Sequence, residues 1–124
     1  MSVYYDYLIS GRPDDVLERL TRKIGAVSRW GAFHQKVGIT NNPERRWAMG
    51  YRSHGWQEMR VLYRSSNRDH TLDLERRLVK RFRENLCFSP GYYHNVAPGG
   101  EGRPPLTGPF FLYVVTARKF TRFI

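Results

Sequence analysis

The chain has little cysteine and no long apolar run. Cys87 is the single cysteine among 124 residues, which excludes an internal disulfide and a multi-cysteine metal site. The longest apolar run, from Phe110 to Val115, is far shorter than the roughly 20 residues of a membrane-spanning helix. The first ten residues lack the basic segment and the small-residue cleavage site of a secretory signal. These absences predict an intracellular protein, cytoplasmic, nucleoid-associated or nuclear, that is neither secreted nor embedded in a membrane.

Acidic residues are also scarce. The chain has 11 Asp plus Glu against 21 Lys plus Arg, which gives a formal net charge of +10. Such an excess indicates a polyanionic partner, and DNA is the leading candidate. A solubility surface or a patch for a membrane surface are the alternatives. The 40% hydrophobic and 15% aromatic content is typical of a folded domain rather than a basic disordered tail, and the length allows one domain.

Hydrophobic periodicity and turn residues predict an alternation of strands and helices. We expect strands at 3–9, 33–40, 59–64 and 110–116, helices from 13 to near 30, at 43–51 and at 71–86, and a loop at 89–108. The order predicts a layered α+β or α/β domain. Residues 99–102, Gly-Gly-Glu-Gly, lack the strand-to-helix context of a phosphate-binding loop, and no organic cofactor is expected.

One carboxylate is out of place in the helix expected at 71–86. On a helical wheel of about 100° per residue, Glu75 falls inside the apolar arc that contains Leu74, Leu78 and Phe82. A carboxylate that faces a core costs several kcal/mol unless a cation or hydrogen bonds compensate it. Glu75 is therefore either a structural acid, paired with an arginine or reaching the edge of the arc, or a carboxylate at the floor of a cleft that holds a divalent metal.

Residues 36–46, Lys-Val-Gly-Ile-Thr-Asn-Asn-Pro-Glu-Arg-Arg, resemble the second half-motif and first helix of the GIY-YIG nuclease family. The resemblance is to the phage-type branch, in which lysine replaces the first tyrosine and gives a KIG-like sequence. Residues 74–82 are similar to the metal-binding helix of the family. The resemblance covers about 33–102, with the strand at 3–9 added, and a C-terminal strand and basic tail at 110–124 lie outside it. We expect 1–124 to form a single domain, and the resemblance implies a mainly antiparallel sheet of three to four strands flanked by helices.

The resemblance also implies roles for individual residues. Arg46, eight residues after Gly38, would stabilise the scissile phosphate, with Arg45 as the alternative. Glu75 would hold one Mg²⁺ or Mn²⁺ whose other ligands are waters and phosphate oxygens. After the helix, Asn95 resembles a late polar residue that shapes the site, and His94 adjoins it.

The segment Tyr5 to Ile9 is similar to the first half-motif, so Tyr7 would be the catalytic tyrosine and Tyr5 the alternative. Asp6 is polar where the family is usually apolar, and the segment that leads to Lys36 carries an extra helix. The strand at 111–115 fits the local pattern better, and Tyr113 would occupy the site if the topology were permuted.

The remaining candidates are cationic. We expect the strand at 33–40 to pair with the strand at 3–9, so Lys36 could lower the pKa of the catalytic tyrosine or touch the phosphate. The alternative is an exposed strand lysine. Arg76 and Lys80, on the outer face of the helix at 71–86, could follow a phosphate backbone.

Together these features predict a metal-dependent DNA endonuclease that hydrolyses phosphodiester bonds. Because the chain is too small for a separate specificity domain, we expect weak sequence preference and action as a monomer or dimer. A nucleic-acid-binding module that has lost catalysis is the first alternative. A basic structural or RNA-associated protein is the second.

Overall fold

The computed structural model describes residues 3–29, 33–84, 105–119 and 121–123, except for the side chains of residues 6 and 7. Along the chain the elements are β1 (Val3–Ile9), α1 (Pro13–Val27), β2 (His34–Thr40), α2 (Pro43–Arg46), the π turn η2 (Trp47–Tyr51), the 3-10 turn η3 (Arg52–His54), β3 (Glu58–Ser65), α3 (Arg68–Glu84) and β4 (Phe110–Ala117). None of the described helices combines the length and the apolar character that crossing a bilayer requires.

The strands form one mixed sheet in the order β1-β3-β4-β2. β4 pairs antiparallel with both β2 and β3, whereas β1 runs parallel to β3 at the opposite edge from β2. Two of the three strand pairs are antiparallel, so the expected α+β domain with a mainly antiparallel sheet is confirmed.

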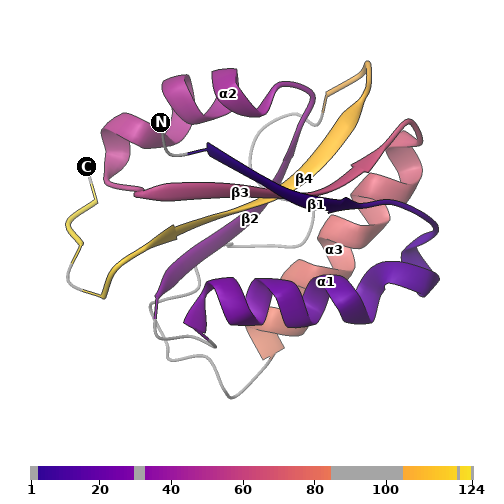
Figure 1. Cartoon of the computed structure of the whole chain (residues 1–124), viewed down its shortest axis with the longest axis horizontal. Coiled ribbons are helices and arrows are strands. Elements are labelled where there is room, and N and C mark those ends of the chain that lie inside the picture. Colours follow the sequence, from indigo (N-terminus) through magenta and orange to yellow (C-terminus); the bar gives the residue numbers. More distant parts are fainter. Residues whose placement is uncertain (1–2, 30–32, 85–104, 120, 124) are drawn as a thin grey trace.

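Helices cover both faces of this sheet. Figure 1 shows α1 and α3 on one face, with α2 and the turns that follow it on the other. Leu20 of α1 and Leu78 of α3 pack with Val37 and Val114 from the strands in one buried cluster. On the other face, Trp47 and Tyr51 pack with a second set of strand residues that includes Tyr113. The two clusters make the sheet a partition between two apolar layers.

The helix at Glu75 begins earlier than the periodicity indicates. α3 starts at Arg68 rather than at Thr71 because Asn67 caps it. The side-chain oxygen of Asn67 accepts a hydrogen bond from the backbone N–H of His70 at 3.0 Å, which satisfies one of the free donors at a helix start. The cap adds a polar first turn that carries no hydrophobic signal.

Candidate active site

Lys36 and Gly38 of β2 lie on the face of the sheet that α2 covers. The β2–β4 register pairs Gly38 with Tyr113 and Lys36 with Val115, and both partners belong to the cluster on the α2 face. Gly38 is the point of closest approach, because a Cβ added there would lie 2.3 Å from the Tyr113 hydroxyl oxygen. Because Gly38 has no side chain, the Tyr113 phenol can pack directly against the backbone of β2.

The Tyr113 hydroxyl is the centre of a small polar group in this layer. Tyr51 and Tyr113 are 3% and 1% exposed, and their hydroxyl oxygens are 2.6 Å apart in a hydrogen bond. Arg46 Nε donates to the Tyr113 hydroxyl at 3.4 Å. We call Lys36, Arg46, Tyr51 and Tyr113 the tyrosine cluster.

Two cations face the Tyr51 ring of the tyrosine cluster. Arg46 Cζ is 5.4 Å and Lys36 Nζ is 5.8 Å from the ring centroid, within the range of cation–π attraction. Burial and the Tyr51 hydroxyl raise the pKa of Tyr113 well above its ordinary value, although Arg46 opposes the shift. Tyr113 is therefore a neutral phenol at neutral pH in the free protein, and a stronger positive field is needed before it can hold a negative charge.

The local sequence after β2 explains how Arg46 and Tyr51 come together. Asn42 caps α2 by accepting the Arg45 N–H, and Pro43 occupies the first turn. The helix then widens into η2, where the Arg52 N–H bonds to the carbonyl of Trp47. This five-residue step places Arg46 and Tyr51 on one side of the turn, whereas α-helical spacing of three or four residues would not. Tyr51 was not among the residues expected from the sequence, because nothing in the pattern indicates a π turn.

A hollow of about 320 Å³ adjoins the tyrosine cluster. Arg46 lines it together with Arg45, Asn41 and Thr40. Arg46 is half-buried and Arg45 is exposed, so a ligand in the hollow meets two guanidinium groups with Tyr113 directly behind one of them. The two arginines therefore lie where an incoming phosphate would contact them.

Comparisons of the chain with protein-family models, with curated proteins and with solved structures find no match.

Glu75 is buried, as the helical wheel indicates, but it lies apart from the tyrosine cluster. It is 4% exposed on α3, and α3 packs on the other face of the sheet against β2, β3 and β4. Burial raises the pKa of Glu75 to about 7, with no contribution from a charged neighbour. Neither guanidinium of the candidate site therefore compensates this carboxylate.

The donor chemistry of Glu75 fits a single ligand of a hard divalent cation. The carboxylate is buried without a compensating charge, so a cation would relieve a cost that the folded chain bears. The described residues offer no group of three or more acidic, histidine or cysteine side chains. A cation held by Glu75 would accordingly take most of its ligands from water and phosphate, as Mg²⁺ commonly does.

The raised pKa of Glu75 predicts that the stability of the metal-free protein depends on pH. Its folded pKa of about 7 lies above the ordinary 4.5, so between these values the folded chain keeps a proton that the unfolded chain has released. The free energy of unfolding therefore falls as the pH rises from 4.5 through 7, by about 3 kcal/mol for this group. Urea unfolding of the protein in EDTA checks this.

The Glu75→Gln variant should lose that part of the pH dependence and be more stable than the wild type at pH 8. Glu84→Gln, at an exposed position of the same helix, should leave the dependence unchanged. Equal slopes for the wild type and Glu75→Gln would show that Glu75 is compensated in solution.

The N-terminal strand does not pair with β2, and the expectation that it would is wrong. β3 and β4 lie between β1 and β2, so Tyr5 and Tyr7 belong to the far edge of the sheet. The Tyr5 hydroxyl donates to Glu44 of α2, and burial together with this carboxylate raises the pKa of Tyr5. The strand that does flank β2 is β4, which is the permuted arrangement that would make Tyr113 the site tyrosine.

The basic residues of α3 lie away from the tyrosine cluster. Arg76 is exposed and donates to Asp73 at 2.6 Å, and Lys80 is exposed. Their neighbours Arg77 and Arg81 form ion pairs with acidic residues of α1. His94 and Asn95 lie outside the described residues.

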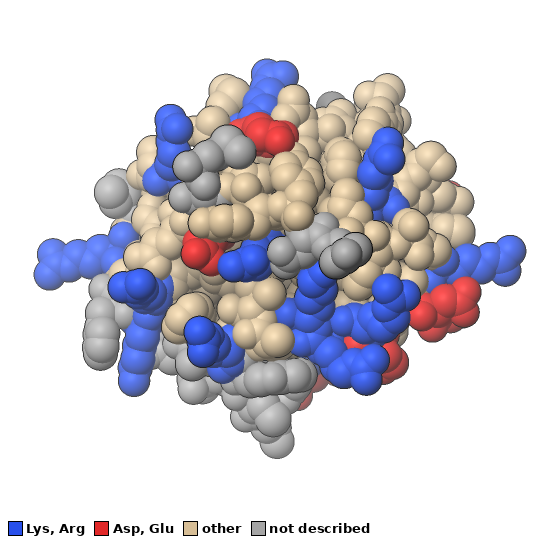
Figure 2. Space-filling model, viewed as in Figure 1, with Lys and Arg blue, Asp and Glu red and all other residues tan. Residues whose placement is uncertain are grey.

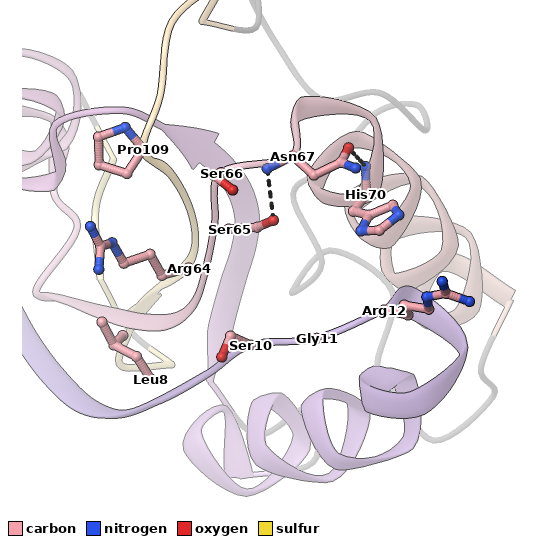
Figure 3. Close-up of a pocket in the computed structure, with 10 residues that line it drawn as sticks. All are labelled: Leu8, Ser10, Gly11, Arg12, Arg64, Ser65, Ser66, Asn67, His70 and Pro109. Atoms are coloured by element: carbon pink, nitrogen blue, oxygen red, sulfur yellow. Dashed lines mark hydrogen bonds between the residues drawn. The ribbon is translucent and has the colours of Figure 1, made fainter.

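A larger hollow of about 690 Å³ lies at the end of the sheet where β1 and β3 stop. Figure 3 shows Arg12 and His70 at one side of it and Arg64 at the other, with Ser10, Ser65 and Ser66 between them. Arg64 Cζ is 6.0 Å from the ring centroid of Phe111, and the Asn67 side chain already accepts from His70. Of the expected active-site residues that the structure describes, none lines this hollow.

Proposed function

We propose that the chain is a metal-dependent DNA endonuclease whose catalytic centre is the tyrosine cluster. The observation that carries this proposal is the contact of Tyr113 with Gly38, Arg46 and Tyr51. A tyrosine hydroxyl next to a guanidinium that lines an open hollow provides a proton acceptor and a phosphate ligand at one point. The resemblance of residues 36–46 to the GIY-YIG family supports the same chemistry, with Tyr113 in the role first given to Tyr7.

Arg46 would bind the scissile phosphate through the guanidinium nitrogens that face the hollow, and Arg45 would hold the neighbouring backbone. Hydrogen bonds between a planar guanidinium and phosphate oxygens are short and strong. Arg46 Nε is 3.4 Å from the Tyr113 hydroxyl, so the same side chain would also favour charge on that oxygen.

Tyr113 would act as the general base in its ionised form, with the phenolate charge shared with Tyr51 through their hydrogen bond. The phenolate would accept a proton from the attacking water and become a neutral phenol. Lys36 and Arg46, on the Tyr51 ring, supply part of the positive field that the phenolate needs. A divalent cation held by Glu75 would supply Lewis-acid chemistry on the α3 face of the sheet, whereas Arg46 would bind the scissile phosphate on the α2 face.

A nucleic-acid-binding protein without catalysis is the second candidate function. The separation of Glu75 from the tyrosine cluster and the raised pKa of Tyr113 favour it. Either function fits a basic protein, and Figure 2 shows lysine and arginine side chains spread across the face in view, with few acidic side chains among them. In both cases we expect weak sequence preference, because backbone contacts carry no sequence information.

Nicking of supercoiled plasmid with Mg²⁺, with Mn²⁺ and with EDTA distinguishes the two functions. We expect metal-dependent nicking that falls by roughly 100-fold or more in Arg46→Ala and in Glu75→Gln. Arg19→Ala, which removes one exposed charge of α1, is the matched control and should nick at close to the wild-type rate. A folded wild type that shifts DNA at low salt but never nicks it would establish the binding protein instead.

A further inference from the structure

A third hollow, of about 710 Å³, lies at the opposite end of the sheet from that in Figure 3. The first residues of β1 and β3, the last residues of β4 and the end of α1 surround it. Its wall includes Tyr4, Arg29, Phe33, Arg60 and Arg118. We call it the arginine–aromatic hollow.

Two of its arginines lie over aromatic rings. Arg60 Cζ is 4.8 Å from the ring centroid of Tyr4, and Arg29 Cζ is 5.8 Å from that of Phe33. Tyr4 is 40% exposed, so its ring is accessible although the guanidinium covers part of it. A guanidinium against an aromatic ring makes a flat, positively charged surface on which a nucleobase can stack.

The backbone at Arg29 supports a role for that side chain. Arg29 has a φ of 55°, a left-handed conformation that is uncommon for residues other than glycine. A glycine at the end of α1 would adopt it without strain. The chain instead has an arginine there, and its guanidinium lies over Phe33.

The charge of the hollow favours an anionic ligand with flat groups. Three arginines line it against one carboxylate, Glu58, which is 3.6 Å from Arg60. A duplex backbone would satisfy the arginines, but its bases are paired and cannot stack on Tyr4 or Phe33. A single strand offers both unpaired bases and phosphates.

We propose that the arginine–aromatic hollow binds a single-stranded segment of nucleic acid. One or two bases would stack on the Tyr4–Arg60 and Phe33–Arg29 pairs, while Arg118 contacts the adjoining phosphates. This inference rests on the proposed function: single-strand binding in the hollow would make DNA with a single-stranded stretch near the cut the preferred substrate of the nuclease. Tyr4 and Arg60 pair in register on the face that α1 covers, whereas the tyrosine cluster lies on the α2 face. The bound nucleic acid would therefore pass round the edge of the sheet to reach the tyrosine cluster.

Fluorescence anisotropy in EDTA tests the binding without cleavage. The probes are a thymidine oligonucleotide of about ten nucleotides, the same oligonucleotide with abasic positions, a duplex and thymidine monophosphate. We expect the single strand to bind more tightly than the other three. Tyr4→Leu and Arg60→Gln should each weaken it by roughly tenfold.

Tyr4→Phe, which keeps the ring, and Arg19→Ala, which removes one charge elsewhere, are the matched controls and should bind within about twofold of the wild type. The inference is overturned if Tyr4→Leu and Arg60→Gln, shown to be folded by circular dichroism, bind no worse than these controls. It is also overturned if the abasic probe or the mononucleotide binds as tightly as the full strand. Binding that meets these expectations, without nicking of plasmid DNA, would contradict the proposed function and still support single-strand binding in the arginine–aromatic hollow.

Discussion

We expect the replacement of Gly38 with alanine to destabilise the protein and, under the proposed function, to abolish nicking. The added Cβ would lie 2.3 Å from the hydroxyl oxygen and 2.5 Å from Cζ of Tyr113. Tyr113 is 1% exposed, so the packed residues around it prevent a small shift that would relieve the clash. The phenol must therefore be displaced from its position between Gly38 and Tyr51. We expect a loss of about 1–3 kcal/mol in the free energy of unfolding, measured by urea denaturation, together with loss of nicking.

Gly50→Ala is the matched control for this substitution. A Cβ at Gly50 would meet Arg46 at 3.6 Å, an ordinary contact, and alanine is favourable in a helical turn. We therefore expect this variant to be as stable as the wild type or slightly more stable. A Gly38→Ala protein with wild-type stability and nicking would mean that Tyr113 does not lie against β2.

Under the proposed function, replacing Tyr113 with phenylalanine should reduce nicking by roughly 10²- to 10⁴-fold, the usual contribution of a positioned acid or base. The change removes a hydroxyl and keeps the ring that fills the core. The free energy of unfolding should fall by about 1 kcal/mol, because Tyr51 loses one hydrogen-bond partner. Single-turnover nicking with saturating protein separates the chemical step from DNA binding.

Tyr7→Phe is the control that separates the two tyrosine assignments. Tyr7 belongs to β1, and two strands lie between β1 and β2, so this variant should nick at the wild-type rate. A large loss in Tyr7→Phe with full activity in Tyr113→Phe would restore the N-terminal assignment and reject the tyrosine cluster as the centre.

The sequence could predict features that depend on neighbouring residues. The burial of Glu75 follows from its place in a helical repeat, and the elements follow from local periodicity and turn residues. Lys36, Gly38 and Arg46 lie in one segment, so their common location needed no long-range information. These features agree with the structure because short spacings determine them.

The tyrosine assignment depended on which strands pair, and periodicity carries no such information. β1 and β4 are both aromatic and β-branched, so either could lie beside β2. The choice depends on the long-range packing of the whole sheet. Tyr51 was missed for a different reason, because the π turn that aligns it with Arg46 has no signature in residue spacing.

Under the proposed function, the position of β4 near the end of the sequence means that activity requires almost the whole chain to have been synthesised. β4 is an inner strand that joins β2 to β3 and carries Tyr113, yet α1, β2, α2, β3 and α3 all precede it in the sequence. A nascent chain that stops before Phe110 holds Arg46 and Glu75 but has no strand to connect the two halves of the sheet. Under the proposed function, ribosome-bound fragments and early truncations would leave nearby DNA uncut, and nuclease activity would arise only after β4 has been made.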